Sequence, residues 1–549
     1  MAGMALIGLL VLVAFVPSSE AGGLSLRRAN ILSELLIFDD DRVPPADEEP
    51  AGEVDAEPVD WERIGKELAR QRDSVQQPVQ TLPAEARQRF EWRPGETVAE
   101  LLAAGSTPDD EAADTASEQQ PAGNDLPPFP ERPAEFPQGG PAIERFDTTA
   151  NCPMQAFYRK LATGQPVRIA VLGDSFIEGD ILTADLREGL QQCFGGRGTG
   201  FAPAASPLTQ FRRTIKTRSK GWSSYNIMQR KTTPAELLND YLVSGIVCRP
   251  ETGASTRWEM TAERERLDPA DQAQFWFLSR TDSRIEVCLN DTLRRTFEVG
   301  ASPALREIAV RLPEALHALE VRVLSGAAGV TGYGARFTGD CGVTVDNFSI
   351  RSNNGRALFQ TSAALNSQLQ ELAAYDLIIL QYGLNIMQQG VHGYTRYGQQ
   401  IVEMITYVRH CFPGAAVLVL GVSERSVKTE RGFEPMDALP AMLRQQRQSA
   451  EACGAAFWNT CEAMHADGGI ERFVAMGWAG KDYTHINYAG GARIARRLCA
   501  ALYEEAEAVR RRIEAETVQR QETEPLLDPA AIDSLLFDRL PVNRPLEHP

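Results

Sequence analysis

The stretch RIAVLGDSFIEGDILTADLREGL, residues 168–190, decides the fold of this chain. It begins with an apolar run typical of a buried strand, turns sharply at Gly173, Asp174 and Ser175, and continues with helical periodicity. A strand followed directly by a helix is the unit from which parallel α/β sheets are built. A serine at such a turn either caps the helix or acts as a nucleophile, and the turn alone leaves both interpretations open.

More strand–helix units follow from Cys341 onward. Residues 375–383 (YDLIILQYG) and 415–423 (AAVLVLGVS) read as buried parallel strands, and residues 395–412 and 438–454 read as helices. A further helix, residues 154–164, leads into the first strand. Residues 205–340 instead lack long helical periodicity and contain strand-like runs at residues 274–280, 283–290, 292–299, 306–313 and 318–326. We therefore expect an α/β domain that is split by an inserted β-sandwich-like domain.

Composition divides the chain into five parts. A 13-residue apolar run, Met4 to Val16, precedes Pro17 and a small-residue site, which is typical of a signal peptide. Because no Lys or Arg precedes this run, an uncleaved N-terminal anchor stays open. The predicted parts are the following: signal peptide or anchor, 1–21; a Pro/Ala/acid-rich, largely disordered region, 22–145; the α/β domain, 146–204 and 341–505; the inserted β-rich domain, 205–340; a charged helix and flexible tail, 506–549.

Charge and cysteine usage restrict the partners. A net charge of −18 argues against nucleic acid, because phosphate binding needs clustered Lys and Arg. The chain has nine cysteines without a CxxC pair, so neither zinc nor another metal is predicted, and no cofactor is predicted either. An odd number of cysteines leaves at least one thiol unpaired within the chain.

Four polar residues stand where a parallel α/β sheet binds ligands, beyond the carboxyl ends of its strands or before the final helix: Ser175, Asn385, Asp482 and His485. A serine hydroxyl needs a base, and histidine is the usual base near neutral pH. The three-residue spacing of Asp482 and His485 allows a local carboxylate–imidazole pair. Asn385 can donate an amide N–H to an oxyanion, beside the backbone N–H of Ser175. Ser423 is a rival nucleophile, but no base lies near it in the sequence.

The motifs GDSF (173–176), GLN (383–385) and DYTH (482–485) resemble blocks I, III and V of the SGNH (GDSL-type) esterases and acyltransferases. The resemblance implies a flavodoxin-like three-layer α/β/α domain. It also implies Ser175 as the nucleophile, His485 as the base, Asp482 as its orienting partner, and Ser175 and Asn385 as oxyanion donors.

The chain departs from the family pattern at three points. Phe176 replaces the Leu of GDSL, and Ile386 replaces the Asp of the usual GxND. The family's block II, which supplies a backbone N–H to the oxyanion hole, corresponds to VDNFSIRSNNG (345–355). Gly355 is the preferred donor in that stretch, with the backbone of Ser352 as the alternative.

The long β-rich insertion is similar to that of SGNH enzymes that act on O-acetylated peptidoglycan or exopolysaccharide and carry a carbohydrate-binding-like module. By this resemblance we expect an esterase whose partner is an acylated polysaccharide or peptidoglycan. From the apolar run Met4 to Val16 we expect it to be exported and periplasmic or in the cell envelope. A membrane would be a partner only through an uncleaved N-terminal segment. Two alternatives stay open: an O-acetyltransferase to a glycan hydroxyl, and a non-catalytic carbohydrate-binding or envelope-scaffolding protein. Tryptophans 222, 258, 276 and 478 are either sugar-stacking or core residues.

Overall fold

The computed structural model describes residues 20–21, 24–25, 89–94, 126–207 and 211–523. The chain forms two compact units, Met1–Val59 and Asp60–Pro549. In the first unit, β1 (Glu20–Ala21) pairs antiparallel with β2 (Leu24–Ser25). The apolar run of the predicted signal peptide and the tail after residue 523 lie outside the described residues. All elements named below belong to the second unit.

A six-stranded sheet in the order β15-β5-β16-β17-β20-β4 forms the centre of the α/β domain. Its strands are β5 (Val167–Gly173), β15 (Val343–Ser349), β16 (Leu377–Gln381), β17 (Ala416–Leu420), β20 (Ala456–Trp458) and the antiparallel β4 (Glu144–Arg145). The other strands pair in parallel, and every residue of β16 and β17 is buried. Numbered in chain order, the parallel strands follow the order 2-1-3-4-5 of flavodoxin-like sheets. The α/β fold predicted for this domain is confirmed.

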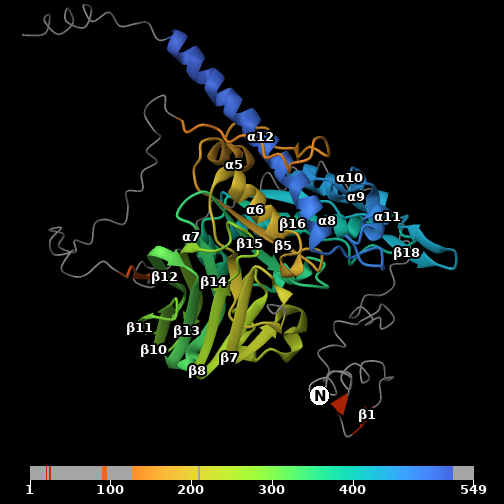
Figure 1. Ribbon diagram of the computed structural model, residues 1–549. Coiled ribbons are helices and arrows are strands. Elements are labelled where there is room, and N and C mark those ends of the chain that lie inside the picture. The colour runs from red at the N-terminus through yellow and green to blue at the C-terminus, as the bar shows by residue number, and fades with distance from the viewer. Residues whose placement is uncertain (1–19, 22–23, 26–88, 95–125, 208–210, 524–549) are drawn as a thin grey trace, which may run out of the picture. The chain divides into compact units, whose positions relative to one another are not determined.

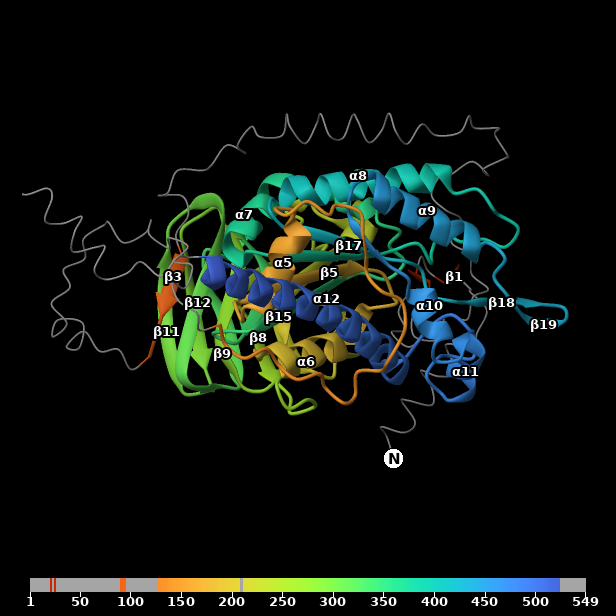
Figure 2. The ribbon, with the colours of Figure 1, turned by 90° about the horizontal axis from the view of Figure 1, so that it is seen from above.

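Helices cover both faces of this sheet, which makes three layers (Figure 1, Figure 2). The helices α5 (Pro153–Ala162), α6 (Thr183–Phe194) and α12 (Tyr488–Thr523) pack together on one face. The opposite face carries α7 (Ala363–Ala373), α8 (Thr395–Cys411) and α9 (Leu439–Ala452). Helix α8 packs on the sheet because it is amphipathic: its buried residues Tyr397, Ile401, Ile405 and Val408 recur at the spacing of one helical face. The loops after β17 and β20 carry the hairpin β18 (Ser426–Thr429) and β19 (Gly432–Pro435) and the short helices α10 (Thr460–His465) and α11 (Gly469–Ala475).

The insertion folds as a ten-stranded sheet together with β3 (Arg89–Trp92). The inserted strands, with β6 just before them, are β6 (Gly200–Pro203), β7 (Ile215–Asn226), β8 (Ile246–Met260), β9 (Ala270–Ser279), β10 (Ser283–Leu289), β11 (Leu293–Val299), β12 (Ser302–Leu316), β13 (Ala318–Ser325) and β14 (Val330–Thr338). Each of the five strand-like runs predicted from the sequence is a strand. One pair of residues, Gly332 with Cys248, joins β14 to β8 and so connects the two halves of the sheet.

Aromatic residues of β9 connect two cores. Trp258 of β8 lies with its ring centroid 6.2 Å from Phe275 of β9, inside the insertion. The next residue, Trp276, points to the opposite face because side chains alternate along a strand. There it stacks on Phe201 at 5.4 Å, and Phe201 lies 5.1 Å from Phe348 of β15 in the α/β domain. Trp258 and Trp276 are both fully buried and are core residues.

Two segments are more ordered than their composition indicates. Composition predicts disorder up to residue 145, yet residues 126–145 lie against the α/β domain: Phe136 and Ile143 are buried, and Trp458 Nε1 donates to Pro141 O at 3.0 Å. The last predicted helix of the α/β domain and the charged helix after residue 505 form one continuous helix, α12, of 36 residues. Apolar anchors spaced between prolines, as in 126–145, are enough to order a segment when a core lies beside it.

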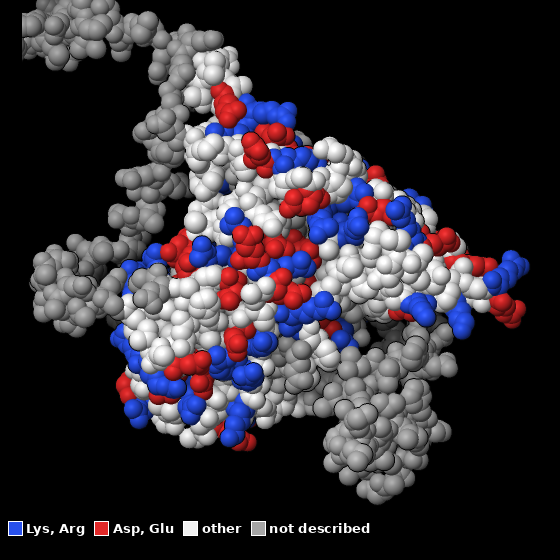
Figure 3. All heavy atoms as spheres, in the orientation of Figure 1, with Lys and Arg blue, Asp and Glu red and all other residues white. Residues whose placement is uncertain are grey.

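Three further properties of the described residues bear on function. All nine cysteines lie within the described part of the chain, and each is a free thiol there. None of the helices in this part combines the length and the apolar character needed to cross a bilayer. Figure 3 shows acidic and basic side chains interspersed on the face that it draws, rather than one extended patch of a single sign.

Candidate functional site

Three loops meet at the carboxyl ends of the neighbouring strands β15, β5 and β16. They follow Ser349, Gly173 and Gln381, the last residues of those strands. Asn385 joins all three loops, since its Nδ2 donates to Asp174 Oδ2 at 3.0 Å and to Asn353 O at 3.1 Å. The chain reverses its direction of winding between β5 and β16, which is where sheets of this type bind ligands.

Ser175 lies on the turn after β5, half-buried, at the edge of this junction. The turn is narrow at Gly173, where an added Cβ would lie 2.8 Å from Gln381 O and 2.6 Å from Ile177 Cδ1, so only glycine fits. The backbone N–H of Phe176 donates to Asp174 Oδ1 at 3.0 Å and holds the turn. The Phe176 side chain is buried, as expected for a residue that takes the place of an apolar Leu.

Asp482 and His485 form the local pair that their spacing predicted. His485 Nδ1 lies 2.6 Å from Asp482 Oδ2, and the His485 backbone N–H donates to Asp482 Oδ1 at 3.1 Å. The hydrogen bond that His485 donates to the Asp482 carboxylate raises the pKa of His485 above its ordinary value, against partial desolvation. Desolvation opposes ionisation of Asp482, but hydrogen bonds from His485 lower its pKa to about 2. The pair is therefore a carboxylate that orients an imidazole and stabilises its charged form.

The loop that carries this pair is tied to the loop that carries Ser175. The hydroxyl oxygen of Tyr488, three residues after His485, lies 2.8 Å from Gly179 O and 2.8 Å from Phe211 O, so its one O–H is within reach of both carbonyls. An added Cβ at Gly491 would lie 1.9 Å from Ile181 O, so this glycine lets the start of α12 approach the same loop. The charges of Asp174 and His485 influence each other's pKa. The final loop thus brings the imidazole to the region of Ser175.

Asp174 is a site residue that the sequence reasoning missed, because an Asp in a Gly-Asp-Ser turn reads as a helix cap. It is fully buried, and burial raises its pKa to about 7, while hydrogen bonds from Phe176 and Gln381 oppose that rise. Its Oδ2 accepts the amide of Asn385. The signal was its position directly before Ser175, but only the fold places Asn385 beside it.

The backbone N–H of Gly355, predicted as the block II oxyanion donor, already donates a hydrogen bond within its own loop. Gly355 has a left-handed φ of +93° and is buried, and its N–H donates to Asn353 Oδ1 at 2.9 Å. The alternative, Ser352, is exposed and has a φ of +60°, which is uncommon for a residue other than glycine. The neighbouring Asn353 carbonyl contacts Asn385, so Ser352 lies next to the junction of the three loops.

The rival serine and two further histidines have other surroundings. Ser423, the rival nucleophile, is buried at the end of β17 and its Oγ has no hydrogen-bond partner among the described residues. His465 pairs with Glu424 at 3.2 Å, and the exposed His392 pairs with Asp437 at 3.6 Å. No group of three or more metal-ligating side chains occurs within the residues that the structure describes.

The hairpin β18–β19 extends the site outward. Phe433 of β19 stacks on Tyr483, with centroids 4.2 Å apart and an interplanar angle of 22°. Tyr483 lies between Asp482 and His485, and its carbonyl accepts the backbone N–H of Ser426 at 3.0 Å. The sequence offered no sign of this contact, because Phe433 follows an exposed turn and lies 50 residues before Tyr483.

Comparison with known proteins gives matches among solved structures. No protein family matches the sequence, and no curated protein matches it. A peptidoglycan O-acetylesterase aligns with a TM-score of 0.53 at 20% identity, over 67% of this chain and 99% of that one. A family two carbohydrate esterase from Cellvibrio japonicus aligns with a TM-score of 0.23 at 11% identity, over 54% of this chain and 98% of that one. A GDSL-like lipase from Parabacteroides merdae aligns with a TM-score of 0.22 at 15% identity, over 30% of this chain and 74% of that one.

The alignment with the peptidoglycan O-acetylesterase spans almost the whole of that protein and two thirds of this chain. This chain shares its fold with that peptidoglycan O-acetylesterase, which agrees with the fold implied by the motifs GDSF, GLN and DYTH.

Proposed function

We propose that this chain is an exported serine esterase of the SGNH type that removes acyl groups, above all acetyl groups, from a cell-envelope polysaccharide or peptidoglycan. One observation carries the proposal: His485 Nδ1 lies 2.6 Å from Asp482 Oδ2 on a loop that Tyr488 ties to the loop of Ser175. A carboxylate-oriented imidazole near a serine at a strand end supplies the groups that acyl transfer needs. The fold shared with a peptidoglycan O-acetylesterase supports the substrate class.

In the proposed reaction Ser175 Oγ attacks the ester carbonyl, and His485 Nε2 takes the hydroxyl proton. Asp482 holds Nδ1 and stabilises the imidazolium. The tetrahedral intermediate collapses to an acyl-serine, and His485 returns the proton to the departing sugar oxygen. A water then attacks the acyl-serine, again with His485 as base, and releases the free acid. Transfer to a glycan hydroxyl would differ only in the group that attacks the acyl-serine.

The proposed oxyanion donors are the backbone N–H of Ser175, the amide of Asn385 and one block II backbone N–H. For the third we favour Ser352 over Gly355, since the Gly355 N–H already donates to Asn353. Both Asn385 N–H groups face protein acceptors, Asp174 and Asn353, so an oxyanion would share or displace one of them. Such donors stabilise charge that develops only in the transition state.

The insertion is proposed to contribute to glycan binding. Its first loop borders the site, because the carbonyl of Phe211 accepts the hydroxyl of Tyr488 at 2.8 Å. The Phe211 ring is 43% exposed and offers an apolar face of the kind that packs on sugar rings. Export is proposed from the apolar run Met4 to Val16.

The test measures acetate released by the full chain from O-acetylated peptidoglycan, with the same glycan stripped of its esters by mild base as the blank. A fluorophosphonate is added in parallel, and the labelled peptide is identified by mass spectrometry. The proposal expects acetate release and a label on Ser175. Acetyl groups recovered on an added oligosaccharide would assign transfer instead of hydrolysis. Glycan binding without release or labelling would make the chain a binding protein and reject the esterase.

The pH dependence of this reaction should follow His485. A general base must be neutral, and Asp482 raises the pKa of His485 above its ordinary value of about 6.5. We therefore expect kcat/KM to rise with pH through a midpoint above about 6.5. Asp482→Asn should lower both the midpoint and the plateau, whereas Asp437→Asn, at the surface pair with His392, should change neither. An unchanged midpoint in Asp482→Asn would remove His485 as the base.

Asn385→Ala should lower kcat/KM by about 10²- to 10³-fold, the usual effect of removing one oxyanion donor. Asn385 is exposed and contacts only the loops of the site, so the fold should persist. The control is Asn226→Ala, which removes a side-chain acceptor for the Met228 backbone N–H in the insertion. Equal activity of the two variants on p-nitrophenyl acetate would exclude Asn385 from the mechanism.

A further inference from the structure

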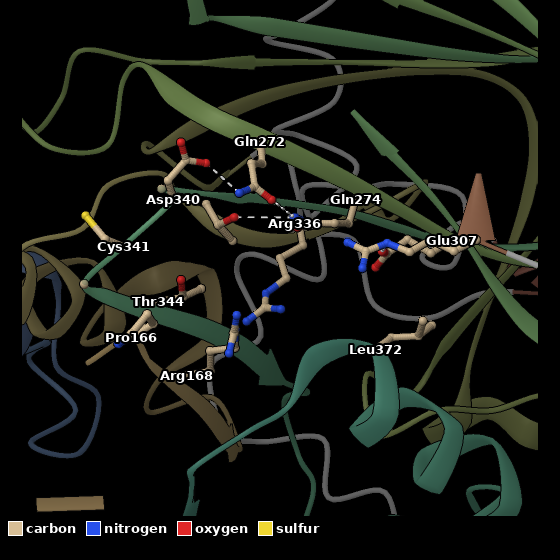
Figure 4. A pocket seen from close by; sticks show the side chains of 14 residues that line it. Pro166, Arg168, Gln272, Gln274, Glu307, Arg336, Asp340, Cys341, Thr344 and Leu372 are labelled. Atoms are coloured by element: carbon tan, nitrogen blue, oxygen red, sulfur yellow. Dashed lines mark hydrogen bonds and ion pairs between the residues drawn. The ribbon is translucent and has the colours of Figure 1, made fainter. Parts of the chain in front are cut away.

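A polar cavity with a volume of about 120 Å³ lies between the α/β domain and the insertion. It is separate from the site above, because Arg168 lines it from the start of β5, whereas Ser175 follows the end of that strand. Arg336 of β14 lines it from the insertion side, and the two side chains extend toward each other across the cavity (Figure 4). Two like charges that face each other at a domain junction need an explanation.

Contacts with the protein hold the Arg336 side chain in place, but they do not use all of its N–H groups. It is 3% exposed, its Nε lies 2.9 Å from Asp346 Oδ2, and its Nη1 donates to Ala373 O at 3.4 Å. Its Nη2 has no hydrogen-bond partner among the described residues. A buried, unpaired N–H of a charged group costs free energy, which a ligand acceptor would recover.

Arg168 adds a second charge at the same place. No hydrogen bond or ion pair of its guanidinium is found within the described part of the chain, although its backbone N–H donates to Asp376. Burial, and next the charge of Arg336, lower the pKa of Arg168 below its ordinary value. The Arg168 guanidinium thus faces that of Arg336.

The carboxylates nearby already accept from other donors. Asp376 accepts from Lys160 Nζ at 2.7 Å. Asp346 accepts from the Tyr375 hydroxyl at 2.6 Å and from the Phe201 N–H at 2.9 Å. Glu307 pairs with Arg89 at 2.9 Å and accepts from Trp276 Nε1 at 2.9 Å. Asp340, at the rim, accepts from Gln272 at 2.6 Å and pairs with Arg311. Each of these four carboxylates is matched by one cation, namely Lys160 for Asp376, Arg336 for Asp346, Arg89 for Glu307 and Arg311 for Asp340. The positive charge of Arg168 is therefore left over.

We propose that this cavity binds a small oxyanion between the guanidinium groups of Arg168 and Arg336. Guanidinium groups match the oxygens of phosphate, sulfate and carboxylates with paired N–H donors. The cavity has room for several water molecules, and so for a polyatomic ion, but not for a sugar chain. Because Arg168 and Arg336 belong to the two different domains, the bound ion would fasten the insertion to the start of β5. The site is independent of the esterase proposal.

The test is calorimetric titration of the full chain, dialysed free of oxyanions, with sodium phosphate, sulfate or acetate at constant ionic strength set by sodium chloride. We expect one site per chain, and a rise in Tm of at least about 2 °C at saturating ion. Tighter binding of phosphate and sulfate than of acetate would assign a tetrahedral ion, and the reverse order a carboxylate.

Arg168→Gln should weaken binding about tenfold or more, since it removes a charged donor pair. In ion-free buffer this variant should be as stable as the natural protein or more so, because the repulsion of Arg336 is relieved. The control is Arg159→Gln, an exposed arginine on α5, which should bind like the natural protein. Absence of binding for all three ions, or equal binding by Arg168→Gln, would overturn the proposal.

Discussion

Replacing Ser175 by alanine is expected to lower kcat/KM for p-nitrophenyl acetate by about 10⁴-fold or more, with no change in the fold. Loss of the nucleophile leaves only the oxyanion donors and substrate binding. Ser175 is half-buried, and within the described residues no hydrogen bond of its hydroxyl is found. The free energy of unfolding should therefore change by less than about 0.5 kcal/mol. The measurement is initial rates of p-nitrophenol release together with a thermal unfolding curve of each protein.

The matched control is Ser423→Ala, at the end of β17. That serine was the rival nucleophile, but it is buried and its Oγ has no hydrogen-bond partner in the described part of the chain. Its removal should leave the rate unchanged and cost no stability. A Ser175→Ala/His485→Ala double variant should be no slower than Ser175→Ala alone, because residues that act in one step are not additive. Undiminished turnover in Ser175→Ala would remove this serine from the reaction.

Asp180→Asn is expected to destabilise the protein by about 3–5 kcal/mol, the usual cost of removing one partner from a buried ion pair. Asp180 is fully buried, and its Oδ2 lies 3.0 Å from Arg187 Nη1 and 2.8 Å from Arg212 Nε. Arg212 comes from the insertion, and Asp180 follows Ser175 by five residues, so this group joins the two domains next to the site. The side chains of Thr183, Thr214 and Asn347 also donate to the carboxylate.

Asp180→Asn removes the negative charge without adding backbone strain. Asp180 has a φ of +67°, a conformation that Asn tolerates as well as Asp does. The control, Asp291→Asn, has a φ of +62° and a salt bridge with Arg257 at 2.8 Å, but its side chain is 60% exposed, so its loss should cost at most about 1 kcal/mol. Both are measured by equilibrium unfolding in urea.

The stabilisation that the Asp180 carboxylate gives the fold should decrease at low pH. Although complete burial opposes ionisation, Arg187 and Arg212 hold the pKa of Asp180 well below its ordinary value. A carboxyl group with a lowered pKa stabilises the fold above its unfolded pKa of about 3.9, and this stabilisation is lost as the pH falls through the folded pKa. The difference between the natural protein and Asp180→Asn should therefore be full at pH 7 and shrink below about pH 4. A pH-independent difference would mean that the destabilisation is not electrostatic.

Much of the α/β domain was predictable because its signals are local. The apolar run before Ser175 and the helical pattern after it lie within one short stretch, and the same holds for β16, β17, α8 and α9. Asp482 and His485 are three residues apart, so a single turn is enough to pair them. The insertion was predictable as strands, but not in its pairing, because strand pairing depends on partners far along the chain.

The order of residues 126–145 was not predictable from composition. Prolines and acidic residues around Phe129 and Phe136 favour disorder when no partner is considered. The structure supplies the partner, since the ring of Phe129 lies 5.4 Å from Tyr503 of α12, hundreds of residues later. Burial of a few aromatic rings then outweighs the local preference.

The sequence by itself determined the strand–helix units, the nucleophile turn at Ser175 and the local Asp482–His485 pair, because periodicity, turn chemistry and short spacings act within a few residues. Only the tertiary structure decided that Asn385 meets Asp174, residues that are 211 positions apart, and that the Gly355 N–H is already taken by Asn353. The tertiary structure alone also placed Arg168 opposite Arg336. Such contacts follow from how whole strands and helices pack, and no local pattern encodes which distant side chains that packing brings together.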